Sequence, residues 1–300
     1  MRHSACSPAI PMTPSADTTA RLLIHCPDRP GIIAAVTGFL FEHGANITAL
    51  DQHASDPSGG RFFLRLEFQT PALDVSGTAL RRAFAETVAQ RFEMNWRMHF
   101  ANRGVRTAVL VSRHDHCLRE LLWRWAAGEL PIDLQCVISN HPDLREECER
   151  FGVDFRIIEV NGVEREQAGE QLLAALPEDV ELLVLARYMQ ILSPAVVDQF
   201  RERIINIHHS FLPAFAGANP YQQALDRGVK IIGATAHYVT AELDQGPIID
   251  QEIARVSHRN DVQALRLLGR DLERQTLLRA VQWHAEQRII VDGDKTIVFS

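Results

Sequence analysis

The chain has 300 residues, of which 46% are hydrophobic and 23% are charged, so it is long enough to bury two separate hydrophobic cores. Its formal net charge of −7 argues against the basic proteins that bind nucleic acid or anionic membranes through charge. Its five cysteines are odd in number and include no C-x-x-C pair, which argues against a disulfide framework or a zinc ribbon and favours a reducing, cytoplasmic location.

Residues 1–17 are expected to form a disordered tail. They are rich in Pro, Ser and Thr, and they lack the continuous apolar stretch of a secretory signal. No later stretch reaches the roughly 18 apolar residues that a membrane-spanning helix needs. We therefore expect a soluble protein without a membrane partner.

Residues 18–101 show the element order β-α-β-β-α-β. The strand-like stretches are RLLIHC, ANITALDQHAS, RFFLRLEFQ and NWRMHF, and helices are expected over 32–44 and 75–92. This order closes into an antiparallel sheet with both helices on one face, the ferredoxin-like arrangement. RNA-binding modules share that arrangement, but RFFLRLEFQ lacks the aromatic motif on which they stack bases.

The first turn of this region carries a motif. The stretch CPDRPGIIAAVTGFLFEHGANI resembles the opening of ACT domains, small regulatory modules that bind amino acids or pair with one another. Asp28 and Gly31 lie where free N–H groups at a helix start can receive a carboxylate, and Asn46 is expected beside that turn. The resemblance implies an amino-acid effector site at these three residues, for methionine or glycine, or else a structural remnant that binds nothing. The exposed strand edge of such a module predicts a homo-oligomer.

After a short linker, residues 102–300 alternate strands and helices as in an open, mostly parallel, Rossmann-like α/β sheet. Ligands of such sheets bind beyond the carboxyl ends of the strands. Four loops are therefore candidates for a site: 112–116, 139–141, 186–192 and 206–213. A strand in PIIDQEIARV, a helix over about 261–286 and a hairpin at Asp292-Gly293 are expected to complete the domain.

The stretch NIHHSFLP concentrates polar side chains at the end of a strand. Strand alternation places Asn206 and His208 on one face, so an amide and an imidazole can converge, while His209 is expected to turn away into structural packing. Diverging histidines chelate a metal poorly, and the chain lacks H-E-x-x-H and thiolate spacing, so no metal is expected. Ser210 lacks the G-x-S-x-G surroundings of a nucleophilic serine.

Two further stretches can complete a site. Asp244 precedes Gly246-Pro247, where turn chemistry is the plain alternative, and His237 lies on the strand before it. An amide, an imidazole and a carboxylate together supply an oxyanion donor, a proton-transfer group and an orienting base for acyl chemistry with water. The loop ARYMQILSP can line a flat aromatic ligand, or it can simply precede a helix capped by Ser193.

Three stretches, RIINIHHSFLPAF, GANPYQQALDRGVKIIGATAHYVTAELDQGPII and LARYMQILSP, resemble the formyltetrahydrofolate-dependent formyltransferases and hydrolases, and most closely the deformylases among them. The resemblance covers residues 106–299. It implies a catalytic trio of Asn206, His208 and Asp244 that hydrolyses 10-formyltetrahydrofolate to formate and tetrahydrofolate, with His237 fixing the Asp244 loop. It implies no cofactor, because the folate is the substrate. The pterin pocket of the family maps onto Arg187, Tyr188, Met189, Gln190, Leu192, Thr240, Ala241 and Leu243.

One loop bears on the acceptor of the formyl group. In the related glycinamide ribonucleotide formyltransferases a Gly-rich loop holds the substrate phosphate, whereas residues 112–117 here read SRHDHC and cannot present the same row of N–H groups. Water is therefore the expected acceptor, and formyl transfer to an amine is the alternative. A non-catalytic folate or amino-acid sensor is a further alternative, but it has no need of all three catalytic side chains. Asp115 in this loop is expected to cap the following helix.

Overall fold

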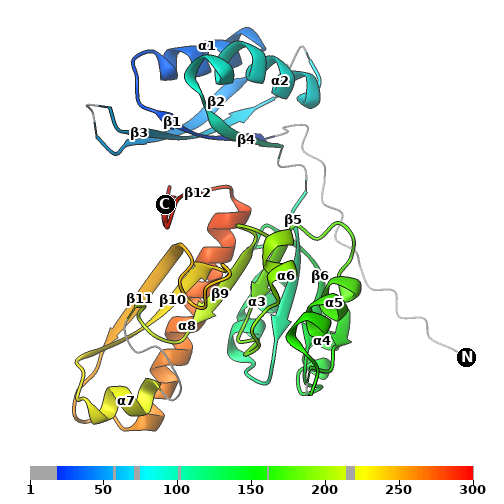
Figure 1. Cartoon of the computed structure of the whole chain (residues 1–300), viewed down its shortest axis with the longest axis vertical. Coiled ribbons are helices and arrows are strands. Elements are labelled where there is room, and N and C mark those ends of the chain that lie inside the picture. The colour runs from blue at the N-terminus through cyan, green and yellow to red at the C-terminus, as the bar shows by residue number, and fades with distance from the viewer. Residues whose placement is uncertain are drawn as a thin grey trace, which may run out of the picture. The chain divides into compact units, whose positions relative to one another are not determined.

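The computed structural model describes residues 19–56, 59–70, 75–100, 103–160, 162–213 and 220–299 (Figure 1). The chain separates into two compact units, Met1–Asn102 and Arg103–Ser300, which we name the N-terminal unit and the C-terminal unit. The tail expected at residues 1–17 lies outside the described residues. None of the helices in these ranges has both the length and the apolarity that crossing a bilayer requires.

The N-terminal unit is an antiparallel sheet with α1 and α2 on one face, as the sequence predicts (Figure 1). Its elements are β1 (Thr19–Pro27), α1 (Ile32–Glu42), β2 (Asn46–Ala54), β3 (Arg61–Gln69), α2 (Gly77–Phe84) and β4 (Asn95–Phe100). The strands lie in the order β2-β3-β1-β4, and each neighbouring pair is antiparallel. Val36 and Leu40 of α1 share one core with Leu64 and Leu66, which project to the same face of β3.

The strand register corrects one expectation about this unit. Pro27 pairs with Arg61 on β3, whereas Asn46 pairs with Gln69 at the other end of the same strand. The helix α1 runs back along the sheet, so the start of β2 is level with the start of β1, with β3 between them. The expectation that Asn46 lies beside the turn of Asp28 is therefore wrong within one copy of the chain.

The C-terminal unit is built on a seven-stranded sheet, most of it parallel, as predicted. Its first elements are β5 (Val105–Val111), α3 (His116–Ala126), β6 (Ile132–Ser139), α4 (Arg145–Arg150), β7 (Phe155–Ile157), α5 (Arg165–Ala175), β8 (Leu182–Leu185) and α6 (Pro194–Gln199). The remaining elements are β9 (Ile204–His208), α7 (Pro220–Asp226), β10 (Ile231–Tyr238), β11 (Ile248–Arg255), α8 (Val262–Ala285), β12 (Ile289–Asp292) and β13 (Lys295–Val298). The strands run β11-β10-β9-β8-β5-β6-β7, and β10 is antiparallel to both of its neighbours.

Both faces of this sheet are covered by helices. On β5, Val109 and Val111 pack in a core that includes side chains of α3 and α8, whereas Ala108 and Leu110 pack in a second core with α5 and α6. Side chains alternate between the two faces of a strand, so a strand covered on both faces needs an unbroken apolar run. The stretch AVLV meets that need.

The connections of β5 create a switch point in the sheet. β6 pairs with β5 on one side, whereas β8 returns to pair with its other side. In open α/β sheets the crevice outside the carboxyl ends of the strands at such a point is the usual ligand site. The loop after β8 and the end of β9 lie at this edge of the sheet.

Two residues lie at the helix N-cap positions that the sequence predicts, but their side chains do not make the expected capping hydrogen bonds. Asp115 precedes α3 and Ser193 precedes α6, yet neither side chain accepts a capping hydrogen bond. Asp115 instead forms ion pairs with Arg119 and Arg270, at 2.9 and 2.8 Å. Its charge is thus used to join α3 to α8.

Candidate active site

Asn206 and His237 lie opposite each other on β9 and β10. The antiparallel register pairs them directly, so both side chains project to the same face of the sheet. Asn206 Nδ2 lies 3.2 Å from His237 Nε2, and His237 Nδ1 lies 2.9 Å from the carbonyl oxygen of Tyr238. Because a carbonyl can only accept, Nδ1 carries the hydrogen of the neutral ring, and Nε2 accepts from the Asn206 amide.

Asp244 connects this pair to His208. Its Oδ2 atom lies 3.3 Å from His208 Nδ1, and its Oδ1 atom lies 3.6 Å from His237 Nε2. The hydrogen bond from His208, followed by the neighbouring ring of His237, holds the pKa of the Asp244 carboxyl well below its usual range despite burial. Asp244 is therefore ionised at neutral pH. The fold thus brings together Asn206, His208 and Asp244, with His237 between them.

The loop that carries Asp244 lies tightly against the end of β10. Asp244 has a left-handed φ of 56°. A Cβ atom at Gly246 would lie 1.7 Å from the carbonyl oxygen of Tyr238, so only glycine fits at this position. The Tyr238 amide also donates to the carbonyl of Pro247, with an N···O distance of 2.9 Å. The Asp244 stretch is therefore a turn, as one interpretation of the sequence expects, and it also fixes a carboxylate at the site.

One ring nitrogen of His208 has no partner among the residues that the structure describes. Its Nδ1 faces Asp244, whereas its Nε2 is buried and has no hydrogen-bonding partner among the described residues. A buried polar atom without a partner costs roughly 1–3 kcal/mol unless water or a ligand satisfies it. Nε2 of His208 is therefore a candidate contact for a polar atom of a substrate.

A cavity of about 280 Å³ lies beside these side chains, near the lower limit of roughly 300 Å³ for typical ligand pockets. Its walls contain every residue that the sequence assigns to catalysis, to the folate or to the support of Asp244. These are Asn206, His208, His237, Asp244, Arg187, Tyr188, Met189, Gln190, Leu192, Thr240, Ala241 and Leu243. The walls also contain Arg165, Leu185, Ile191, Val197 and Glu242.

His209 lines the cavity as well, which corrects the expectation that it turns away into packing. β9 ends at His208, so the strict alternation of faces ends there too. The centroid of the His209 ring lies 5.0 Å from that of His208 and 6.4 Å from that of Tyr221. Burial, followed by the charge of Arg187, lowers the pKa of His209 to about 4, so its ring is neutral near pH 7.

The loop after β8 is held by other elements. Arg165 Nε on α5 donates to the carbonyl of Leu192 at 2.8 Å. The Ser112 amide donates to the carbonyl of Arg187 at 3.2 Å, and the Ser112 hydroxyl hydrogen-bonds to the carbonyl of Tyr188. Arg165 is a site residue that sequence reasoning missed, because an arginine at the start of a helix looks like ordinary surface charge.

The stretch SRHDHC, residues 112–117, contributes no residue to the cavity wall. Its polar side chains instead contact other parts of the C-terminal unit. Ser112 Oγ lies 2.7 Å from Asn140 Oδ1, and His116 Nε2 lies 2.8 Å from Glu273 Oε2. Two polar side chains of this loop are therefore held by contacts outside the cavity.

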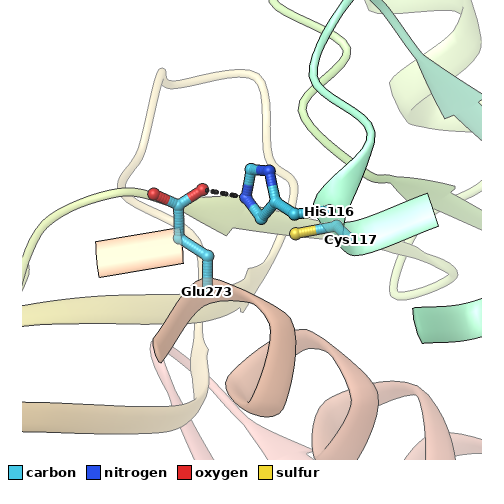
Figure 2. A group of neighbouring side chains, drawn as sticks. All are labelled: His116, Cys117 and Glu273. Carbon is cyan, nitrogen blue, oxygen red and sulfur yellow. Dashed lines mark hydrogen bonds and ion pairs between the residues drawn. The ribbon is translucent and has the colours of Figure 1, made fainter. Parts of the chain in front are cut away.

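His116, Cys117 and Glu273 form a group, among the described residues, whose donor atoms lie close enough together to hold a metal ion (Figure 2). Two observations favour an ion pair over a metal site. Arg187 Nε lies 3.4 Å from Glu273 Oε2, so a cation already faces this carboxylate. Burial raises the pKa of the Cys117 thiol well above its usual value, which disfavours the thiolate that a metal would bind. The expectation that no metal takes part stays a prediction.

Comparison with known proteins relates this fold to a family. The family described as "Formyl transferase" matches residues 105–281, and "ACT domain" matches residues 20–81. A formyltetrahydrofolate deformylase of Bacillus subtilis (strain 168) is 52% identical over 281 residues, 93% of each chain. The crystal structure of a formyltetrahydrofolate deformylase from Pseudomonas syringae pv. tomato str. DC3000 has a TM-score of 0.90 and 44% identity, and covers 94% of this chain and 95% of that one.

A more distant structure matches the C-terminal part of the fold. Glycinamide ribonucleotide transformylase 1 from Symbiobacterium toebii has a TM-score of 0.62 and 32% identity, and the match covers 67% of this chain and 97% of that one. The C-terminal unit therefore defines a protein of the formyl transferase class, with an ACT domain in its N-terminal unit. The deformylase matches extend over nearly the whole of both chains. The chain belongs to the formyltetrahydrofolate deformylase family, as the sequence predicts.

Proposed function

We propose that the protein hydrolyses 10-formyltetrahydrofolate to formate and tetrahydrofolate. The observation that carries this proposal is that Asn206, His208 and Asp244 share one cavity with the loop after β8. The names of the relatives that match nearly the whole chain agree with it. In this proposal the folate is a substrate and not a resident cofactor. Such a reaction balances one-carbon folate pools and supplies formate for purine synthesis.

Asp244 acts on the attacking water. Its ionised carboxylate orients the water toward the formyl carbon and accepts a proton as the new C–O bond forms. Negative charge then develops on the formyl oxygen. The Asn206 amide has two N–H groups, of which one bonds to His237 and the other is available to this oxyanion. His208 Nε2 is the second donor to this oxyanion, and collapse breaks the C–N bond as the proton on Asp244 passes to the leaving nitrogen.

The loop after β8 and residues 240–243 bind the folate in this proposal. Met189, Ile191 and Leu243 line the cavity although they are 59%, 58% and 64% exposed. Exposed apolar side chains at the opening of a cavity suit the face of a flat ring. The polar groups of Arg187 and Gln190, together with those of 240–243, are then available to the ring edges.

Water is favoured over an amine acceptor for a physical reason. A glycinamide ribonucleotide transformylase shares the C-terminal fold, so formyl transfer is the alternative. Residues 112–117 contain no glycine, and the Ser112 amide already donates to the Arg187 carbonyl. The side chains of Ser112, Asp115 and His116 contact Asn140, Arg270 and Glu273. A loop occupied in this way has no row of free amides for the phosphate of an acceptor.

Release of formate tests the proposal. The protein is incubated with 10-formyltetrahydrofolate without any amine, tetrahydrofolate is followed by absorbance, and formate is measured in a separate enzymatic assay. We expect equal amounts of the two products. Turnover that starts only when glycinamide ribonucleotide or another amine is added would sink the hydrolysis proposal and establish formyl transfer.

We also propose that the ACT domain binds an amino-acid effector and joins copies of the chain. Gly31 leads into α1 with a φ of 93°, and Asp28 lies in the same turn. Asn46 lies at the far end of the sheet, so a site that used both Asp28 and Asn46 would have to be completed by a second copy. β2 is an edge strand whose side chains are mostly exposed, which leaves it available for pairing.

Light scattering tests this second proposal. The full chain is measured at micromolar concentration with methionine, with glycine and without either amino acid. We expect an oligomer in all three cases and a change in formate release with the effector. A monomer under all three conditions would refute the pairing, and unchanged formate release would refute the effector.

A further inference from the structure

Glu273 on α8 has His116, Tyr221 and Arg187 as polar partners. Figure 2 shows its carboxylate pointing toward the His116 ring. Glu273 is only 2% exposed. Its Oε1 atom accepts a hydrogen bond from the Tyr221 hydroxyl at 2.9 Å. Its Oε2 atom lies 2.8 Å from His116 Nε2 and 3.4 Å from Arg187 Nε. Three separate segments of the chain, α7, α3 and the loop after β8, therefore meet at this carboxylate.

The partners of Glu273 determine its charge. Burial by itself would raise the pKa of Glu273, but the hydrogen bond from His116 and the charge of Arg187 bring it below its usual value. An ionised carboxylate in the interior requires a cation beside it. Arg187, whose side chain is 11% exposed and whose guanidinium is always charged, supplies that cation.

Arg187 connects Glu273 to the cavity. It lines the cavity and has a left-handed φ of 66°, and Met189 in the same loop has a φ of 57°. Such conformations are unfavourable for residues other than glycine and persist only where surrounding contacts hold them. The Ser112 amide holds the Arg187 carbonyl, and Glu273 holds the Arg187 side chain.

We propose that Glu273 is a positioning residue for the substrate pocket, because its carboxylate anchors the Arg187 guanidinium and so keeps the loop 187–192, strained at Arg187 and Met189, in the shape that binds the folate. Glu273 itself does not line the cavity, and it acts on the substrate only through Arg187. The inference rests on the proposed hydrolysis and adds a residue to the folate site from outside its walls.

The packing around Glu273 supports this role. Gly269 lies one helical turn before Glu273 on α8, and a Cβ atom at this position would come within 1.9 Å of the Tyr221 hydroxyl oxygen. Glycine in a helix interior is less stabilising than alanine. Its use here makes room for the hydroxyl that holds the second oxygen of the carboxylate.

Steady-state kinetics of the full chain test the role of Glu273. Glu273→Gln keeps the size of the side chain but removes the charge that holds Arg187. We expect KM for 10-formyltetrahydrofolate to rise roughly tenfold and kcat to stay within about twofold, because the loop binds the folate while Asp244 and His208 are unchanged. Glu120→Gln on α3 is the matched control. It removes the same charge from ion pairs with Arg124 and Arg274, and it should leave KM unchanged.

Two results would overturn the proposal, and in two further cases another measurement replaces the main test. An unchanged KM in Glu273→Gln, with normal formate release by the wild type, would overturn the positioning role and leave the hydrolysis standing. A zinc ion bound to the wild type and lost in Glu273→Gln would also overturn it, because the carboxylate would then be a metal ligand.

If the wild type releases no formate, the hydrolysis fails, and the tetrahydrofolate affinities of the same variants decide the role of Glu273. If Glu273→Gln does not fold, Glu273→Asp is measured instead: a raised KM supports the proposal, and an unchanged KM overturns it.

Discussion

Asp244 Oδ2 lies 3.3 Å from His208 Nδ1, although His208 ends β9 and Asp244 follows β10. The contact orients the imidazole, whose Nε2 has no partner in the part of the chain that the structure describes. The same contact keeps the carboxyl ionised, because it holds the pKa of Asp244 well below its usual range. Each of the two side chains therefore prepares the other for proton transfer.

Replacing Asp244 by asparagine keeps the shape of the side chain and removes the proton acceptor. We expect kcat for formate release to fall by roughly 10²- to 10⁴-fold, the usual contribution of a general base, with little change in KM. In the wild type, kcat should show no loss from protonation of Asp244 over the pH range in which ordinary carboxyls titrate. Near wild-type turnover of Asp244→Asn in the formate assay would show that another group accepts the proton.

Asn206→Ala removes the proposed oxyanion donor. We expect kcat to fall by roughly 10²- to 10³-fold, as for other single oxyanion donors. Asn260→Ala provides a control, because Asn260 accepts from the Ser257 amide in a loop outside the cavity wall, and its kcat should stay unchanged. A rise in KM alone at Asn206→Ala would assign this amide to substrate binding and contradict its role in the transition state.

Gly246→Ala should displace the loop that carries Asp244, because the added Cβ would lie 1.7 Å from the Tyr238 carbonyl oxygen. A shift of about 1 Å in a catalytic group can cost roughly 100-fold in rate, and we expect a loss of this order in kcat. Gly38→Ala is the matched control, because nothing lies within 4 Å of a Cβ at Gly38 in α1. It should keep kcat unchanged and leave the thermal midpoint the same or higher. Equal kcat for the two variants would show that the Asp244 loop tolerates the shift.

His209 makes stability depend on pH. Burial, followed by the charge of Arg187, lowers its pKa to about 4, whereas a histidine of the unfolded chain has a pKa of about 6.5. Between these values the unfolded chain binds the extra proton, so stability is complete above about pH 6.5 and falls by up to roughly 3 kcal/mol toward pH 4. Urea unfolding on both sides of this window, with His209→Asn for comparison, measures the effect. The variant should lose less stability on acidification, and an equal loss in both proteins would contradict this assignment.

The element order could be predicted from the sequence because hydrophobic period and turn residues agree at most boundaries. α8 begins where Asp261 accepts from the Ala264 amide, and β12 and β13 meet beside Gly293. The register of β2 could not be predicted in this way, because it depends on how far α1 carries the chain back along the sheet. The motif that joins Asp28 to Asn46 in the sequence contains no information about that distance.

The sequence also predicts part of the candidate site, but it does not predict the residues whose placement depends on tertiary packing. Asn206 and His208 share a strand, so alternation alone predicts that they converge. Asp244 was a candidate beside a turn interpretation, and the family resemblance assigned it to the catalytic trio. His209 was misplaced because alternation ends with the strand. Glu273 was missed because a single glutamate on a long helix looks like surface charge, and only the packing of α8 beside α3 brings it to His116.

Met189, Ile191 and Leu243 leave more than half of their surfaces in water at the cavity opening. A folate ring lying against them would take that apolar area out of water, and burial of apolar area gives a negative heat-capacity change. Tetrahydrofolate binding should therefore become more exothermic as the temperature rises. Polar contacts alone would not give this calorimetric signature, so these three side chains provide a thermal measure of how the ring is bound.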